Sequence, residues 1–201
     1  MTTSSDKPTM ILLADWVPGP QQGKWTYNDY AALNDGQRYE IANGVLLMTP
    51  APSWSHQEIV GEIFAHLRTY VRTTGLGGVF TAPIDVELAP KDVFQPDVVV
   101  LLKASREKLK DKRIVGAPDL IVEVFSPSSE IYDRLNKYDT YARAGVPEYW
   151  IVNPKKRTVE VLVLEAGAYH SLGVFQGEQT PLSRVVPGFG VAVEQFFASV
   201  W

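Results

Sequence analysis

The stretch Leu120-Ile121-Val122-Glu123-Val124-Phe125 combines an apolar run with a single acidic residue, and it decides the fold class predicted for this chain. An apolar run of this length is typical of a strand at the centre of a sheet, buried on both faces. The two-residue period of a strand puts Glu123 on the same face as Ile121 and Phe125. Burial of an unpaired carboxylate is costly. We therefore expect Glu123 to be protonated, paired with a cation or bound to a metal, unless this end of the strand is solvated.

A second acidic residue, Asp97, follows Pro96 and opens the apolar run Val98-Val99-Val100-Leu101-Leu102. A Pro-Asp pair at the start of a strand is also a common structural feature, and its interest here lies in the pairing with Glu123. Two carboxylates on neighbouring strands can hold a hard divalent ion, which prefers oxygen ligands. Such an ion polarises a phosphoryl oxygen and lowers the pKa of an attacking water.

The segment Ser126-Pro127-Ser128-Ser129 leads from this strand into a predicted helix over residues 129–144, with a serine as its N-cap. A helix N-terminus beside a carboxylate pair favours an anion such as phosphate, although a plain turn accounts for the segment equally well. In the helix, Lys137 is spaced i,i+4 from Asp133, which is consistent with an exposed ion pair. Lys137 also lies on the flank of the apolar stripe, from which its side chain could reach back towards the sheet.

The rest of the chain alternates between strand and helix patterns, which predicts an α/β fold with a mixed sheet. Apolar residues at helical spacing predict a long helix over residues 53–73, and shorter helices are expected over 26–33 and 193–200. Extended segments are expected at residues 38–48, 78–81, 84–88, 97–102, 119–125, 148–152 and 158–164, with hairpin turns at Asn43-Gly44 and Asn153-Pro154.

The chain has 201 residues, of which 45% are hydrophobic, with no cysteine and a net charge of −4. We expect a loosely held N-terminal arm over residues 1–24 and a single domain over 25–201. The lack of cysteine excludes disulfides and thiolate metal sites, and it suits a reducing compartment. No transmembrane helix or signal peptide is recognised, so we expect no membrane association and a cytoplasmic location.

Basic residues are concentrated in two short segments, although the net charge is slightly negative. Residues 103–113 hold six basic and two acidic residues, and Lys155-Lys156-Arg157 lies at the predicted closing hairpin. Both segments could contact the phosphates of a nucleic acid, or they could be solvated loops.

Other polar residues give weaker signals. The histidines His56, His66 and His170 lack metal-ligand spacing, and helix capping or hydrogen bonding explains His56 equally well. Asp85 and Glu87 alternate along a predicted strand, and we expect them to be solvated.

Several motifs occur in an order that resembles a known family. They are Tyr39-Glu40-Ile41 with Gly44, His56-Gln57, Gln95-Pro96-Asp97, Gly116-Ala117-Pro118-Asp119-Leu120, Glu123-Val124-Phe125-Ser126-Pro127-Ser128, Asp133, Lys137, Tyr141, Ala144-Gly145-Val146 and Glu148-Tyr149-Trp150. Over about residues 25–164, the chain resembles the Uma-type family of putative restriction endonucleases, a branch of the PD-(D/E)XK nuclease superfamily. The resemblance implies a restriction-endonuclease-like core, in which a mixed central sheet is flanked by helices.

The resemblance also implies a site. Asp97 and Glu123 would be the metal-binding acids, with Mg²⁺ or Mn²⁺ as the ion, and Glu40 would be a third acidic group near the metal. The superfamily pattern has Lys two residues after the second acid, and here that position is Phe125. Lys137, in the following helix, is the residue that matches the displaced lysine.

Two functions follow from this interpretation. The first is a divalent-metal-dependent endonuclease that hydrolyses phosphodiester bonds in DNA through Asp97, Glu123 and Lys137. The second is a catalytically silent nuclease-fold protein that binds nucleic acid or a protein partner. For the first function we expect a two-fold homodimer, because two symmetry-related sites address two antiparallel strands.

Overall fold

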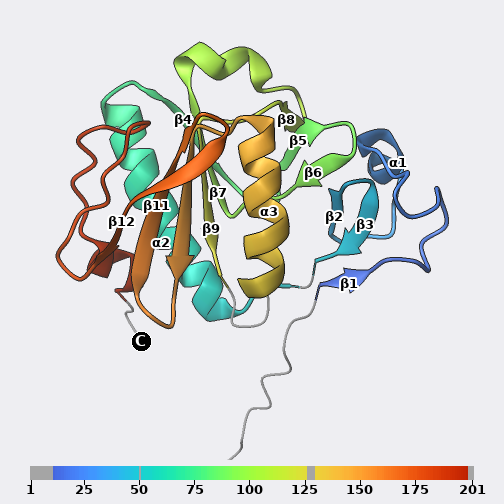
Figure 1. Cartoon of the computed structure of the whole chain (residues 1–201), viewed down its shortest axis with the longest axis horizontal. Coiled ribbons are helices and arrows are strands. Elements are labelled where there is room, and N and C mark those ends of the chain that lie inside the picture. The colour runs from blue at the N-terminus through green and yellow to red at the C-terminus, as the bar shows by residue number, and fades with distance from the viewer. Residues whose placement is uncertain (1–10, 50, 126–129, 199–201) are drawn as a thin grey trace, which may run out of the picture.

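A computed structural model of the chain describes residues 11–49, 51–125 and 130–198, with the side chains of residues 130–136 left aside. Within these ranges the chain forms two six-stranded mixed sheets, three α-helices and two short 3₁₀ helices (Figure 1). The predicted serine N-cap, the Asp133–Lys137 ion pair and the first ten residues of the predicted arm lie outside what the structure describes. The helices are α1 (Tyr27–Ala31), α2 (Trp54–Thr73) and α3 (Glu130–Ala144), with η1 (Lys103–Lys108) and η2 (Val193–Phe197) as the 3₁₀ helices.

The first sheet has the strand order β1-β3-β2-β6-β5-β8. Its strands are β1 (Leu12–Leu13), β2 (Tyr39–Ala42), β3 (Val45–Met48), β5 (Asp85–Ala89), β6 (Asp92–Phe94) and β8 (Arg113–Val115). The β2–β3 hairpin turns at Asn43 and Gly44, which both have positive φ, of 51° and 75°. This confirms the predicted Asn-Gly turn and fixes the register of β2, in which Glu40 faces Leu47 across the pair.

The second sheet has the strand order β12-β11-β10-β9-β7-β4 and contains the segment that decided the fold class. Its strands are β4 (Gly77–Thr81), β7 (Val98–Leu102), β9 (Leu120–Val124), β10 (Glu148–Asn153), β11 (Thr158–Glu165) and β12 (Ala168–Gln176). Strand β9 lies between β7, with which it is antiparallel, and β10, with which it is parallel. All five residues of β9 are buried, as expected of a central strand.

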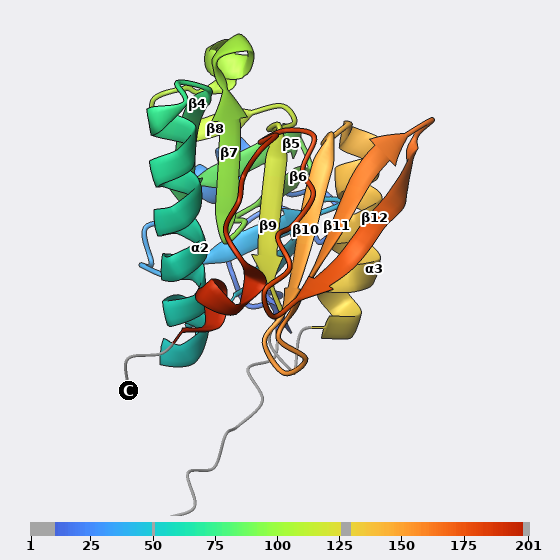
Figure 2. The ribbon, with the colours of Figure 1, turned by 90° about the vertical axis from the view of Figure 1, so that its left-hand side faces the viewer.

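The second sheet is covered on both faces, with α2 on one side and α3 on the other (Figure 2). Leu120, Val122 and Val124 of β9 pack in one core cluster with the apolar face of α2 and with η2. Ile121 and Phe125 pack in another cluster with Tyr141 of α3 and with side chains of the first sheet. Glu123, between them in the strand, therefore faces the junction of α3 and the two sheets.

The predicted α/β class and the mixed sheet flanked by helices are confirmed, but the strands are divided between two sheets rather than collected in one. The prediction missed β6 and β8, which have only three residues each and are too short to show a hydrophobic period. It also missed β12, in which Tyr169 is the one buried residue and the exposed and half-buried residues do not follow a period of two.

Residues 11–24 are not a loosely held arm. Leu12–Leu13 forms β1, which pairs with β3, and the backbone of Ala14 donates to the carbonyl of Leu46. Ala14 is fully buried with Trp25 in a core cluster of the first sheet. Leu12 and Leu13 themselves stay exposed, so the segment is held by backbone pairing with the hairpin and by the burial of Ala14.

In the part of the chain that the structure describes, no helix combines the length and the apolarity that a membrane crossing requires.

Candidate active site

Three structural elements bring three charged side chains together at the junction of the two sheets. Glu40 comes from β2 of the first sheet, Glu123 from β9 of the second sheet, and Lys137 from the middle of α3. The Lys137 Nζ atom lies 3.0 Å from Glu123 Oε1 and 3.3 Å from Glu40 Oε1. The three side chains are only 4–7% exposed. One buried cation therefore bridges two buried carboxylates that are 83 residues apart in the chain.

The burial of these charges makes their contacts strong determinants of local structure. An ion in a protein interior loses its hydration, and removal of one partner from a buried pair typically costs about 3–5 kcal/mol. The Glu123 side chain also accepts a hydrogen bond from the Tyr141 hydroxyl at 2.7 Å, one helical turn beyond Lys137 in α3. Burial and the charge of Glu123 raise the pKa of Tyr141 well above its usual value, so this phenol stays protonated and donates.

Glu40 is held from the first sheet. Its Oε1 atom accepts a hydrogen bond from the backbone N–H of Gln95 at 3.0 Å, just after β6. The same oxygen is the one that contacts Lys137, so it lies at a fixed point between the first sheet and α3. Lys137 also lies over the ring of Phe94, with Nζ 5.9 Å from the ring centre. Cation, carboxylate and aromatic face thus share one small volume.

Asp97 lies at the same end of the second sheet but has different partners. It immediately precedes β7, and the β7–β9 register pairs Val98 with Val122, which places Asp97 opposite Glu123. Its Oδ2 atom accepts a hydrogen bond from the backbone N–H of Val124 at 2.8 Å. This contact fixes the carboxylate against the end of β9.

A second contact of Asp97 comes from α2. The His56 Nε2 atom lies 3.2 Å from Asp97 Oδ2 and 3.0 Å from the carbonyl oxygen of Val124. His56 is held by its place in the first turn of α2, where its backbone N–H donates to the N-cap Ser53. Burial lowers the pKa of His56, but the hydrogen bond and charge of Asp97 outweigh this effect, so the net pKa is raised.

A divalent cation finds suitable donors here, although the arrangement is not a ready-made cage. Among the residues that the structure describes, no group of three acidic or histidine side chains converges on one point. Two carboxylate oxygens, of Glu40 and Glu123, do converge on one cationic atom, the Lys137 ammonium. Mg²⁺ typically keeps several waters and needs only one or two protein carboxylates, so the carboxylates of Glu123 and of Asp97, opposite it across β7 and β9, are suitable donors for such an ion.

Behind Glu40, the side chain of Gln95 connects the site to a polar network. Its carbonyl oxygen accepts from Arg38 Nε at 3.0 Å, and its amide donates to Asp85 Oδ1 at 2.9 Å and to the Tyr30 hydroxyl at 3.1 Å. Burial raises the pKa of Asp85 above its usual value, although hydrogen bonds from Gln95 and Tyr30 act in the opposite direction. Asp85 is thus half-buried and hydrogen-bonded rather than simply solvated.

Glu87 is not simply solvated either, because it pairs with Arg113 at 2.6 Å. The neighbouring strand β8 supplies this arginine, and its pairing with β5 was not visible in the sequence. A cross-strand ion pair keeps the alternation of a polar strand face, so periodicity could not separate the two cases.

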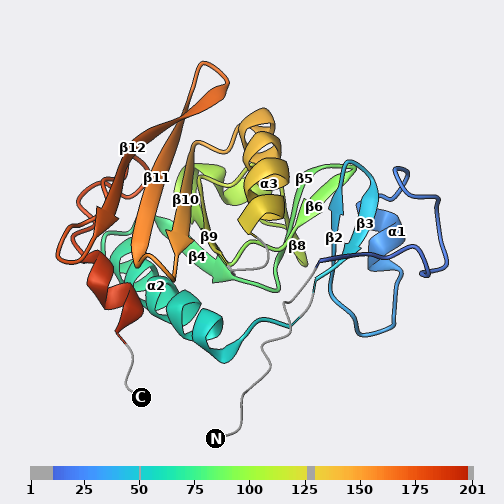
Figure 3. The ribbon, with the colours of Figure 1, turned by 60° about the horizontal axis from the view of Figure 1, so that its bottom comes forward.

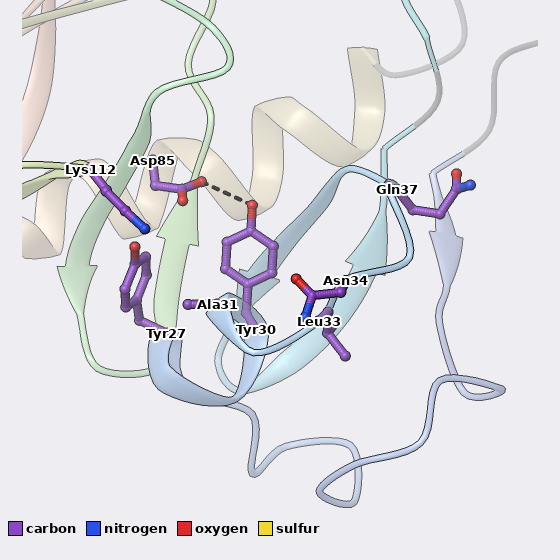
Figure 4. A pocket seen from close by; sticks show the side chains of 9 residues that line it. Tyr27, Tyr30, Ala31, Leu33, Asn34, Gln37, Asp85 and Lys112 are labelled. Atoms are coloured by element: carbon purple, nitrogen blue, oxygen red, sulfur yellow. Dashed lines mark hydrogen bonds between the residues drawn. The ribbon is translucent and has the colours of Figure 1, made fainter.

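The polar network also borders a surface hollow of about 520 Å³ (Figure 4). Asp85 and Tyr30 line it together with Tyr27 and Lys112, and the close-up shows the Tyr30 hydroxyl directed at Asp85. None of the side chains that line this hollow belongs to the Glu40–Lys137–Glu123 cluster. Gln95 separates the two regions while it bonds to both.

The two basic segments lie at opposite ends of the second sheet. Segment 103–113 begins with η1, which follows β7 at the end away from Asp97 and forms the yellow-green turn at the top of Figure 1. The strand between them has five residues, so about 17 Å separates this segment from the candidate site. Lys155 and Lys156 instead follow β10, whose Val152 pairs with Val124 of β9. They are exposed in the turn between β10 and β11, at the end of the sheet that Figure 3 brings forward.

The structure thus places all four predicted site residues at one end of β9, although in two connected groups. Glu40, Glu123 and Lys137 form one group, and Asp97 with His56 forms the other. Sequence reasoning missed the contribution of Tyr141 and Gln95, and it left His56 without a role in the site. The resemblance contained all three residues in its motifs, but only a structure supplies their hydrogen-bond partners.

The fold is similar to that of a protein whose crystal structure has been solved. A crystal structure from Anabaena variabilis, described as a putative nuclease belonging to DUF820, superposes with a TM-score of 0.70. The two sequences are 17% identical, and the match covers 86% of this chain and 97% of the other. At this identity the likeness establishes the fold alone.

Comparison of sequences gives the family. No curated protein matches the chain. The sequence model of the Uma2 family, described as "putative restriction endonuclease", matches residues 26–194, which is most of the chain and includes every residue of the candidate site. The chain therefore belongs to the Uma2 family.

Proposed function

We propose that this protein is a divalent-metal-dependent nuclease that hydrolyses phosphodiester bonds in DNA. The observation that carries the proposal is the buried cluster of Glu40, Lys137 and Glu123 beside Asp97, at one end of a central strand in a nuclease-like fold. Charged groups buried in this number are costly for stability, and such arrangements concentrate at functional sites. The membership of a nuclease family supports the same conclusion.

Asp97 and Glu123 are the residues that would hold the metal ion, Mg²⁺ or Mn²⁺. When bound, such an ion polarises the phosphoryl group and makes a water molecule more acidic. The two carboxylates lie opposite each other across β7 and β9, and the backbone N–H of Val124 keeps Asp97 in place. The Tyr141 hydroxyl, from α3, donates a hydrogen bond to Glu123 and keeps that side chain in place.

Lys137 would act on the phosphate itself. Hydrolysis joins a water oxygen to phosphorus, breaks one P–O ester bond and builds negative charge on the phosphoryl oxygens. A preorganised ammonium directed at those oxygens stabilises this charge, and such donors are typically worth about a hundredfold or more in rate. Glu40 would hold Lys137 at this position, since its Oε1 atom is itself fixed by Gln95.

The proposed substrate and assembly follow from the same role. DNA would approach the end of the sheet that carries the site, where the exposed Lys155 and Lys156 can contact phosphates. A two-fold homodimer would present two sites to two antiparallel strands. A cytoplasmic location suits a chain without cysteine.

One observation favours the alternative, a nuclease-fold protein that binds nucleic acid or a protein partner without cutting. Phe125, at the position where the superfamily pattern has its lysine, is 4% exposed and packs in the core beside α3. Because position 125 holds a core residue and not a lysine, catalysis would depend entirely on Lys137, whose position is set by the docking of α3.

A plasmid-nicking assay separates the two functions. Purified protein is incubated with supercoiled DNA and Mg²⁺ or Mn²⁺, with and without a chelator, and compared with the Glu123→Gln variant. The exposed Glu178→Gln variant is the matched control. Metal-dependent nicking by the parent and by Glu178→Gln, but not by Glu123→Gln, is the expected result. Equal product from the parent and Glu123→Gln would refute the proposed nuclease.

A further inference from the structure

The Glu40–Lys137–Glu123 cluster has a property that a catalytic role of Lys137 does not by itself require. The lysine contacts the carboxylate oxygens of both acids, at 3.0 Å and 3.3 Å, in a volume from which solvent is largely excluded. An ammonium here is a built-in counter-ion of the acids. It provides the positive charge that the two acids need when no metal ion is bound.

We infer that Lys137 is an intramolecular competitor of the divalent cation and lowers its affinity for the site. The inference rests on the proposed function, because it concerns the ion that the nuclease would use. It assigns Lys137 a second role, in which the lysine stabilises the metal-free protein and limits how tightly the site is loaded.

The physical argument starts from the shared oxygen. Glu123 Oε1 already accepts from both Lys137 and Tyr141, so its negative charge is strongly stabilised. A divalent ion that binds this carboxylate approaches its oxygens to about 2.0–2.1 Å, well inside the lysine contact. Ammonium and ion would then repel each other at a few ångströms, in surroundings where water screens poorly. Metal binding must therefore weaken or displace a lysine contact.

Glu40 makes the competition specific to this lysine. Its Oε1 atom is held by the backbone N–H of Gln95, so Glu40 cannot follow the ammonium far when the ion enters. Lys137 can yield, because its four-carbon stem is flexible. The two acids are thus held by partners of their own, Gln95 and Tyr141, whereas the lysine can withdraw along its stem, as expected of a displaceable counter-ion.

The test compares the Lys137→Met variant, which keeps the hydrocarbon volume but removes the charge, with the parent protein. Lys108→Met is the matched control, because Lys108 donates to a backbone carbonyl, of Ala117, rather than to carboxylates. Mn²⁺ affinity is measured by titration calorimetry without DNA. Thermal unfolding is measured in chelator and in Mn²⁺. Neither readout depends on cleavage.

We expect Lys137→Met to bind Mn²⁺ more tightly than the parent by about tenfold or more, because one positive charge has left the site. In chelator the melting temperature of this variant should fall, and Mn²⁺ should raise it by more than it raises that of the parent. Lys108→Met should behave as the parent in the calorimetric measurement. In a Lys137→Met, Glu123→Gln double variant, the gain in Mn²⁺ affinity should disappear.

An unchanged or weaker Mn²⁺ affinity of Lys137→Met would overturn the inference, and so would absence of Mn²⁺ binding in both proteins. If Lys137→Met does not fold in chelator, its folding is followed by circular dichroism as Mn²⁺ is added. Recovery with Mn²⁺ supports the inference, and no recovery overturns it. The proposed function fails separately, through absence of metal-dependent DNA nicking by the parent.

Discussion

The imidazole of His56 bridges Asp97 and the main chain of Val124, with Nε2 at 3.2 Å from the carboxylate and 3.0 Å from the carbonyl oxygen. One nitrogen thereby connects the first turn of α2 to the ends of two strands of the second sheet. Asp97 Oδ2 is shared between this ring and the backbone N–H of Val124. The orientation of the predicted metal-binding acid thus depends on a residue from a third element.

We therefore predict that His56 positions Asp97 for metal binding. His56→Ala should weaken Mn²⁺ binding by about 10–100-fold, the usual effect of losing an outer partner of a metal ligand. His56→Gln should retain part of the affinity, because its amide can donate from nearly the same place. Titration calorimetry gives both values. His66→Ala, a histidine of the same helix that pairs with Glu62, is the control. Equal Mn²⁺ affinities for His56→Ala and the parent would rule out this role.

A second prediction concerns the acids themselves. Asp97→Asn and Glu123→Gln should each severely weaken Mn²⁺ binding, because a neutral amide is a much poorer ligand for a hard cation. Calorimetry on the two variants, with circular dichroism as a check of folding, tests this. Glu178→Gln is again the control, since this residue is exposed outside the site. Should both variants keep the affinity of the parent, the ion is held elsewhere.

The placement of the basic segments leads to a third prediction. The double variant Lys155→Ala, Lys156→Ala should bind DNA more weakly. Its plot of log binding constant against log salt concentration should also be shallower, by about 0.9 for each phosphate contact that is lost. Lys110→Ala with Lys112→Ala removes the same charge from the far end of the sheet and should change the slope little. Binding is measured in chelator over a series of salt concentrations. If the Lys110→Ala, Lys112→Ala variant instead showed the larger change in slope, the DNA would bind at the η1 end of the sheet.

The raised pKa of Asp85 gives a fourth prediction, on stability. A carboxyl group with a folded-state pKa above its unfolded value contributes stability below the unfolded value, near 3.8, and this is lost as the pH rises through the folded-state pKa. Asp85→Asn removes this dependence. The stability of the variant relative to the parent should therefore increase with pH over this range and then level off. Denaturant unfolding of both proteins at a series of pH values measures it, and a pH-independent difference would contradict the assignment.

The central part of the fold was predictable because its strands and helices have clear hydrophobic patterns. The run that contains Glu123 indicated a buried central strand, and the Asn43-Gly44 pair indicated the hairpin that carries Glu40. The division into two sheets was not predictable, since it depends on the pairing of β6 and β8, which have three residues each. Pairing partners are set by long-range contacts, which a local pattern does not contain.

The candidate site was predictable in its residues but not in its connections. The oddity of a carboxylate in an apolar strand pointed to Glu123, and the strand period gave the face on which it lies. The positively charged partner of Glu123, Lys137, could be inferred only from the family resemblance. It lies 14 residues further along the chain, and only the docking of α3 brings it to Glu123. The network of Gln95 and Asp85 could not be inferred, since its hydrogen bonds join strands and a helix that lie far apart in the sequence.

The last prediction tests whether Lys137 has the catalytic role proposed for it, in place of a lysine at position 125. Lys137→Met should reduce DNA cleavage by about a hundredfold or more, because the charge that builds up on the phosphate loses its ammonium partner.

Phe125 lies two residues beyond Glu123 and packs in the cluster on the same face of the strand. Addition of Phe125→Lys to Lys137→Met should therefore return an ammonium to the site and restore part of the activity. The loss of apolar packing at this buried position should limit the recovery and lower the melting temperature. Nicking rates of the single and double variants, with Lys108→Met as the control, give the comparison. Cleavage by Lys137→Met at the rate of the parent would leave this lysine a counter-ion of the two acids, without a catalytic role.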